Sequence, residues 1–137
     1  MLYDDASVQV RIALADSLES RVEDLVASAR ISAVAAKTNA EQAIAQGNRL
    51  AAFAESGAYG EMESRRFVRY WELGRVGLDS ARIHSVEAIE AADAAIACEE
   101  RACVEKQAAL MRDGMIAAAG AARKAESLIR IALRYVN

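Results

Sequence analysis

The chain has 137 residues, a length that suits one domain, and it contains no proline and 32 alanines. Proline disrupts helix interiors and alanine favours them, so this composition predicts an all-α fold without a β-sheet. A net charge of −3 and a pI of about 5.3 argue against nucleic acid as a partner, and no long uncharged apolar run predicts a transmembrane helix.

The N-terminal residues Met-Leu-Tyr-Asp-Asp lack the basic and apolar regions of a secretory signal peptide. A cytoplasmic location is therefore expected, and export by a route without a cleaved signal stays an alternative.

A first helical arm is expected at about 7–55. Asp4, Asp5 and Ser7 offer N-terminal capping chemistry. A heptad-like apolar seam follows, formed by Leu18, Val22, Leu25 and Ala29. The seam continues with very small residues over 33–47, which predicts a closely packed antiparallel helix beside that stretch.

The strongest break in the pattern is the turn at 56–60, which contains two glycines. An aromatic helix is expected at 61–73, with two acids in its first turn and Phe67, Tyr70 and Trp71 on one face. Arginine, tryptophan and tyrosine are enriched at interface hot spots, so this helix holds the candidate partner-binding residues. They are Arg65, Arg66, Phe67, Arg69, Tyr70 and Trp71. The favoured expectation is that Phe67 and Trp71 fill one end of a bundle core and leave the arginines exposed, and a partner-binding patch is the alternative.

A second arm is expected at about 80–136, with Asp113 and Gly114 as a site for a break. No glycine or proline interrupts residues 81–112, which predicts one long helix there. Apolar residues repeat every seven positions from Ala81 to Ile116, with a second apolar stripe beside them. This face is wider than a two-stranded seam, so a bundle or self-association is expected. Residues 83–105 carry a net charge of −5 and residues 120–137 carry +3.

Cys98 and Cys103 are five residues apart. On an uninterrupted helix they are separated by about 140° of rotation and cannot pair with each other. Two buried thiols that act as small apolar residues are therefore expected, and an intermolecular disulfide or a redox role is the alternative.

Catalytic and metal-binding patterns are weak in this sequence. His84 is the only histidine, and His84-Ser-Val-Glu87 occurs once, whereas a di-metal bundle site needs two Glu-x-x-His units. A Cys98–His84 dyad would span about 21 Å along one helix. No cofactor, no metal and no enzymatic activity are therefore expected.

The pattern as a whole predicts one helical domain over 1–137, in which long antiparallel helices form a coiled-coil-like hairpin or bundle. The expected function is non-enzymatic: an adaptor, chaperone or assembly component that recognises a protein partner, itself included, through helix faces. In shape alone, without a shared motif, this architecture is similar to coiled-coil hairpin stalk proteins and small helical chaperones of bacterial secretion systems. The alternative function is a small-ligand binder or enzyme with a pocket near Trp71.

Overall fold

The computed structural model describes the backbone of residues 2–136 and the side chains of residues 21–136. It confirms the all-α fold: three long helices pack against one another, and no strand occurs in the described backbone. They are α1 (Leu2–Glu55), α2 (Glu61–Ala97) and α3 (Arg101–Leu133). The expectations for Asp4, Asp5, Ser7 and Leu18 concern side chains outside the described residues.

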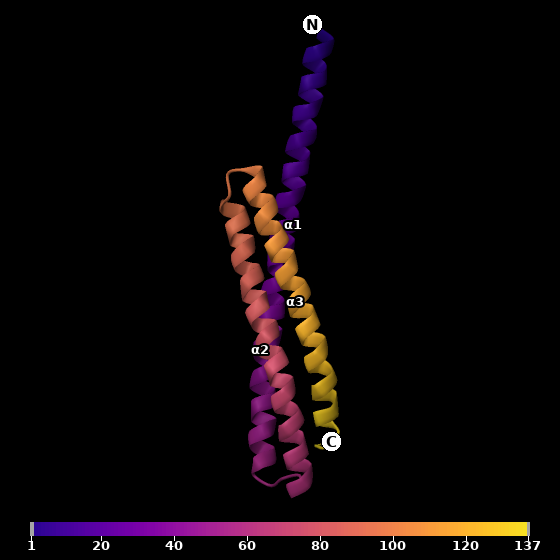
Figure 1. Cartoon of the computed structure of the whole chain (residues 1–137), viewed down its shortest axis with the longest axis vertical. Helices are drawn as coiled ribbons and strands as arrows, with labels where there is room; N and C mark the ends of the chain where they lie inside the picture. Colours follow the sequence, from indigo (N-terminus) through magenta and orange to yellow (C-terminus); the bar gives the residue numbers. More distant parts are fainter. Residues whose placement is uncertain (1, 137) are drawn as a thin grey trace.

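Helix α2 packs against both of the other helices, and all three lie along the long axis of the molecule (Figure 1). It packs antiparallel to α1 on one side and to α3 on the other, whereas α1 and α3 touch each other at few points. The three helices therefore form an open bundle, with α2 as the shared neighbour of both outer helices.

The first turn follows from glycine chemistry. Gly57 and Gly60 have φ angles of +86° and +90°, a region that side chains disfavour and glycine adopts freely. The Ser56 hydroxyl donates to the carbonyl of Phe53 and holds the end of α1. Helix α1 thus ends at Glu55 and α2 begins at Glu61, on either side of this turn.

Four helical glycines, Gly47, Gly74, Gly77 and Gly114, are contact points. The expected separation of an aromatic helix at 61–73 from an arm at 80–136 is wrong, and the chain does not break at 113–114. Helix α2 runs through Gly74 and Gly77, and α3 runs through Gly114. A Cβ at Gly77 would lie 2.9 Å from the Cβ of Ala125, and one at Gly114 would lie 3.3 Å from the Cβ of Ala88. These glycines bring α2 and α3 close together, which offsets their unfavourable helix propensity of about 1 kcal/mol each.

The second turn lies at 98–100, inside the stretch that was expected to be one helix. The expectation about the cysteines is also wrong, because Cys98 and Cys103 form a disulfide with their Cα atoms 5.7 Å apart. The 140° separation holds only on a continuous helix. Cys98 and Glu100 have extended backbone conformations, and this break brings the two sulfurs together.

The core is thin and rich in alanine, and it has two parts. Near the α2–α3 turn it consists mainly of alanines with Val26 and Met111. Near the α1–α2 turn it contains the large side chains Phe67, Trp71 and Leu78. An ion pair links α1 to α2 at the surface: Arg30 Nε donates to Asp93 Oδ1 at 2.6 Å. This hydrogen bond and the carboxylate charge raise the pKa of Arg30.

Candidate functional site

The aromatic helix forms one end of the bundle core. Phe67 is 1 % exposed and Trp71 is 4 % exposed, so neither side chain is available to a partner at the surface. Trp71 lies directly on Gly47 of α1, where an added Cβ would approach the indole to 1.9 Å. The missing side chain of Gly47 leaves the space that the indole fills.

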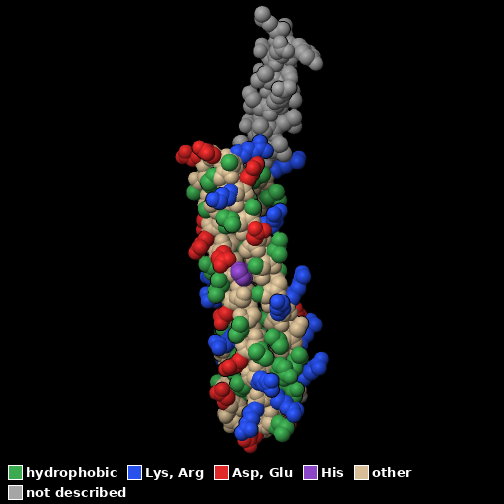
Figure 2. Space-filling view, in the orientation of Figure 1, with side chains coloured by type: hydrophobic (Ala, Val, Ile, Leu, Met, Phe, Trp, Pro, Cys, Tyr) green, Lys and Arg blue, Asp and Glu red, His purple; other side chains and the backbone are tan. Residues whose placement is uncertain are grey.

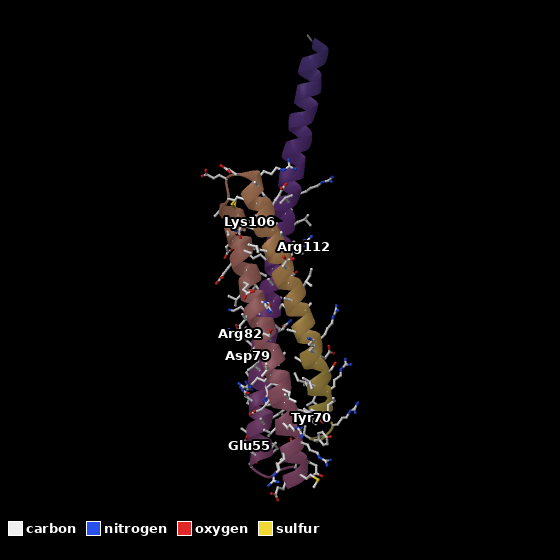
Figure 3. The ribbon with its side chains drawn as sticks, in the orientation of Figure 1. Glu55, Tyr70, Asp79, Arg82, Lys106 and Arg112 are labelled. Atoms are coloured by element: carbon white, nitrogen blue, oxygen red, sulfur yellow. A yellow bond between two sulfur atoms is a disulfide. The ribbon has the colours of Figure 1, made fainter. Side chains whose placement is uncertain are left out.

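The arginines and the tyrosine of the same helix lie outside this core. Tyr70 lies on α2 near the C-terminus of the chain (Figure 3) and is half-buried. Its ring stacks on Tyr135, with centroids 6.1 Å apart. The guanidinium of Arg66 lies 5.7 Å from the centre of the Tyr135 ring. Arg65 is exposed and donates to Glu61, one helical turn away, at 2.6 Å. Arg69 is also exposed.

The six candidate residues therefore separate into two groups. Phe67 and Trp71 belong to the core, and the other four lie at or near the surface. Arg66 and Tyr70 contact Tyr135 and so link α2 to the chain just after α3, whereas Arg65 pairs with Glu61 within α2. Phe67 and Trp71 thus fill the core at this end of the bundle, and the three arginines are exposed beside them.

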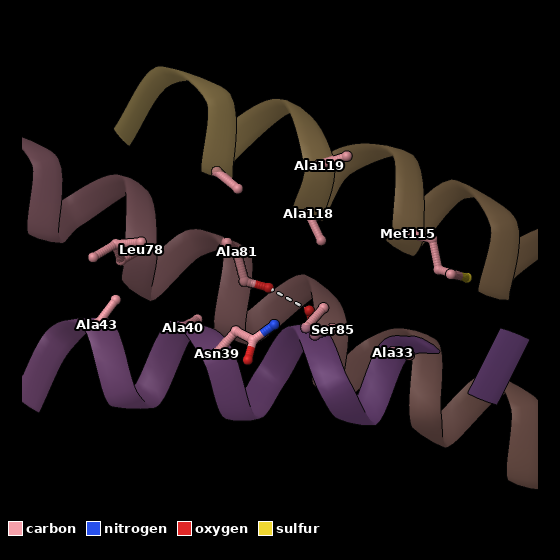
Figure 4. A pocket seen from close by; sticks show the side chains of 12 residues that line it. Ala33, Asn39, Ala40, Ala43, Leu78, Ala81, Ser85, Met115, Ala118 and Ala119 are labelled. Atoms are coloured by element: carbon pink, nitrogen blue, oxygen red, sulfur yellow. Dashed lines mark hydrogen bonds between the residues drawn. The ribbon is translucent and has the colours of Figure 1, made fainter. Parts of the chain in front are cut away.

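A second feature, a groove between α1 and α3, was not singled out by the sequence. Because these helices pack on α2 and hardly touch each other, a space of about 480 Å³ lies between them (Figure 4). Its floor is α2, with Leu78, Ala81 and Ser85. The Ser85 hydroxyl is satisfied, since it donates to the carbonyl of Ala81 at 2.8 Å. The walls are mostly alanines: Ala33, Ala36, Ala40 and Ala43 from α1, and Ala118, Ala119 and Ala122 from α3.

The same groove continues toward the α2–α3 turn. Met115 lines both parts, and the continuation is bounded by Val22, Leu25 and Ala29 on α1 and by residues 105–116 on α3. Here large apolar side chains face solvent: Leu25 is 68 % exposed and Ile116 is 64 % exposed. We define the groove as the space lined by residues 22–43 of α1 and 105–122 of α3.

The groove explains what becomes of the broad apolar face at 81–116. Ala81, Ala88 and Ala95 of that seven-residue repeat are buried in α2. Beyond the turn the repeat continues on α3 with Ala109 and Ile116, which line the open groove. The buried face of α3 is a different repeat, formed by Met111, Ala118, Ala125 and Ala132. The single apolar face expected over 81–116 is therefore two surfaces, a core face on α2 and a groove wall on α3, separated by the turn at 98–100.

Charge is distributed unevenly over the surface. Lys and Arg side chains gather on the part of the visible face that holds the C-terminal half of α3, and acids are more frequent along α2 and near the α2–α3 turn (Figure 2). Two charged residues, Glu105 and Arg112, line the part of the groove near the α2–α3 turn. Among the described residues, none that lines the middle of the groove is charged.

The described residues offer little for chemistry. Among residues 21–136 no cluster of three His, Cys, Asp or Glu side chains could hold a metal ion. His84 Nδ1 lies 3.1 Å from Glu87 Oε2 on the surface of α2, and Cys98 is in the disulfide. No helix, as far as the chain is described, is both long and apolar enough to cross a membrane.

No family model, curated protein or solved structure matches this chain.

Proposed function

We propose that this protein is a non-enzymatic helical interaction module whose binding site is the groove between α1 and α3. The observation that carries the proposal is the open packing: two outer helices lie on a shared central helix and leave an apolar groove between them. A helix laid into that groove would convert three helices into a closed four-helix arrangement, a common way to bury apolar helix faces.

The lining supports a helix as the occupant. Alanine walls allow two helix backbones to approach closely, as the glycine contacts between α2 and α3 already do inside this chain. The nearly uncharged middle of the groove suits an apolar stripe, and the exposed Leu25 and Ile116 supply larger apolar contacts at one end. Each residue such as these, once fully covered, contributes about 1.5–3 kcal/mol.

Self-association is the form of binding that we propose first, because the exposed apolar walls belong to every copy of the chain. An adaptor or chaperone role, in which a different protein uses the same groove, is the broader form of the proposal.

The disulfide bears on the location of the protein, since disulfides persist mainly in oxidising compartments. It favours an exported location over the cytoplasmic one that the N-terminal sequence suggests.

The test places a charge in the groove and compares it with the same charge elsewhere on α1. Ala36 and Ala52 are both exposed on α1, and Ala36 lines the groove. Ala52 is sixteen residues further on, about 160° around the helix. Ala36→Glu is expected to weaken self-association at least tenfold in sedimentation equilibrium, and Ala52→Glu is expected to leave it unchanged. Equal association constants for both variants and the parent protein would show that the groove is not the binding site.

A further inference from the structure

We propose that the occupant of the groove is the N-terminal segment, residues 2–20, of a second copy, with each copy placing its segment in the groove of the other. This inference rests on the proposed function and names the partner and the part of it that binds. It is carried by three properties of the chain: the position of the segment, its length and its sequence.

The position follows from the length of α1. Val22 and Glu23 line a cavity together with Cys98 and Glu99, so this point of α1 lies beside the α2–α3 turn. Helix α1 begins twenty residues earlier, at Leu2, and it continues beyond the end of the α2–α3 hairpin (Figure 1). The segment therefore starts where the groove ends, and it points away from the body of its own chain.

The lengths of segment and groove agree. A helix over residues 2–20 is about 28 Å long, and the groove wall over residues 22–43 is about 32 Å long, at 1.5 Å per residue. Helices α1 and α3 are both antiparallel to α2, so they run in the same direction along the two walls. A second copy related by a two-fold axis near residue 20 would lay its segment antiparallel to both walls. Leu2 of that copy would then reach the level of Thr38, near the far end of the groove.

The two-fold arrangement is reciprocal. The same rotation that places the second segment in the first groove places the first segment in the second groove. Both segments and both grooves are occupied, so the assembly closes as a dimer and leaves no free groove for a third copy. The α1 helices of the two copies would also lie side by side around residue 20.

The sequence of the segment fits an apolar groove with arginines on its α3 side. A helical projection places Leu2, Ala6, Val10, Ala13 and Ser17 within about 80° of one another, a stripe of small and medium-sized residues. The segment contains four acids and one arginine, a net charge of −3.

On α3, Arg112 lines the groove, and Arg123 follows eleven residues later, three helical turns along the same edge. Asp4 and Asp5, the acids nearest the start of the segment, would lie along the groove between the levels of Arg112 and Arg123. Opposite charge therefore favours the antiparallel direction, in which these acids meet the basic half of α3.

The direct test is photo-crosslinking in the full-length protein. Val10 is replaced by p-benzoylphenylalanine, and 15N-labelled and unlabelled copies are mixed before irradiation and digestion with trypsin. Under the two-fold arrangement Val10 lies near the level of residue 30, where trypsin releases the α1 wall as Val22–Arg30 and Ile31–Lys37 and the α3 wall as Gln107–Arg112 and Asp113–Arg123. Crosslinks between labelled and unlabelled copies are expected in these four peptides. Intermolecular crosslinks confined to other peptides, or crosslinks within single copies alone, would overturn the proposal.

A pair of full-length variants separates this proposal from the proposed function. Val10→Asp with Leu14→Asp puts charges into the segment, and Ala36→Glu puts one into the groove. Both are expected to shift the dimer toward monomer by at least tenfold. If Ala36→Glu dissociates the dimer and the segment variant does not, the groove binds a different helix and the segment proposal fails alone. If neither variant changes the association constant, both proposals fail.

Discussion

The contact between Gly47 and Trp71 makes the sharpest prediction about stability. A Cβ added at Gly47 would lie 1.9 Å from Cη2 of the indole and 2.2 Å from Cζ3. Carbon atoms in favourable contact are about 3.5–4.0 Å apart, so the ring would have to move by more than 1 Å. Trp71 is buried, and its neighbours include Phe67 and Leu78. The space for such a movement is therefore small.

The magnitude follows from two opposing effects. Overpacking of a core costs about 1–3 kcal/mol, and replacing a helical glycine by alanine contributes about 1 kcal/mol. Gly47→Ala is therefore expected to lower the free energy of unfolding by up to about 2 kcal/mol. Gly120→Ala is the matched control, because no atom lies within 4 Å of its added Cβ. The control is expected to raise the free energy of unfolding by about 0.5–1 kcal/mol.

Urea denaturation followed by circular dichroism measures both variants. In a double-mutant cycle, Gly47→Ala should cost less in the Trp71→Leu background than in the parent protein, because the shorter side chain leaves room for the Cβ. A Gly47→Ala variant as stabilised as Gly120→Ala would contradict the packing of the indole on α1.

Further predictions concern the aromatic end and the disulfide. Trp71→Ala is expected to lower the free energy of unfolding by about 3–5 kcal/mol, measured by urea denaturation, whereas Arg69→Ala should change it by less than about 0.5 kcal/mol. Trp71 fluorescence should be blue-shifted and protected from acrylamide, and a red-shifted, quenchable spectrum would contradict its burial. Replacing Cys98 and Cys103 by serine is expected to lower the free energy of unfolding by about 2 kcal/mol, the loop-closure value for a six-residue loop. A reductant should destabilise the parent protein to the same extent and leave the double-serine variant unchanged.

The sequence predicted the helical fold because its signals are local. The absence of proline, the alanine content and the two glycines at 57 and 60 each act within a few residues. The burial of Phe67 and Trp71 was the favoured of two alternatives, and composition alone could not exclude the other. The choice depends on Gly47, which is more than twenty residues away in the chain and lies on another helix.

The turn at 98–100 was not predicted, because its residues have no turn chemistry and both cysteines were placed on one continuous helix. The stretch from Ala97 to Cys103 contains neither glycine nor proline, and no side chain caps the end of α2 or the start of α3 with a hydrogen bond in the described structure. The two cysteines indicate the turn if they are allowed to pair, but on one continuous helix they were predicted to be too far apart in rotation to do so. The groove could not be predicted either, because it exists only if the chain reverses at 98–100 and places α3 beside α1.

An unfilled groove in each copy should make this chain associate with itself. Sedimentation equilibrium of the full-length protein over a series of micromolar concentrations measures this association. One chain has a mass of 14.7 kDa, and the weight-average mass is expected to rise to about twice this value and stop there. A mass that stays at one chain throughout the series would contradict self-association through the groove.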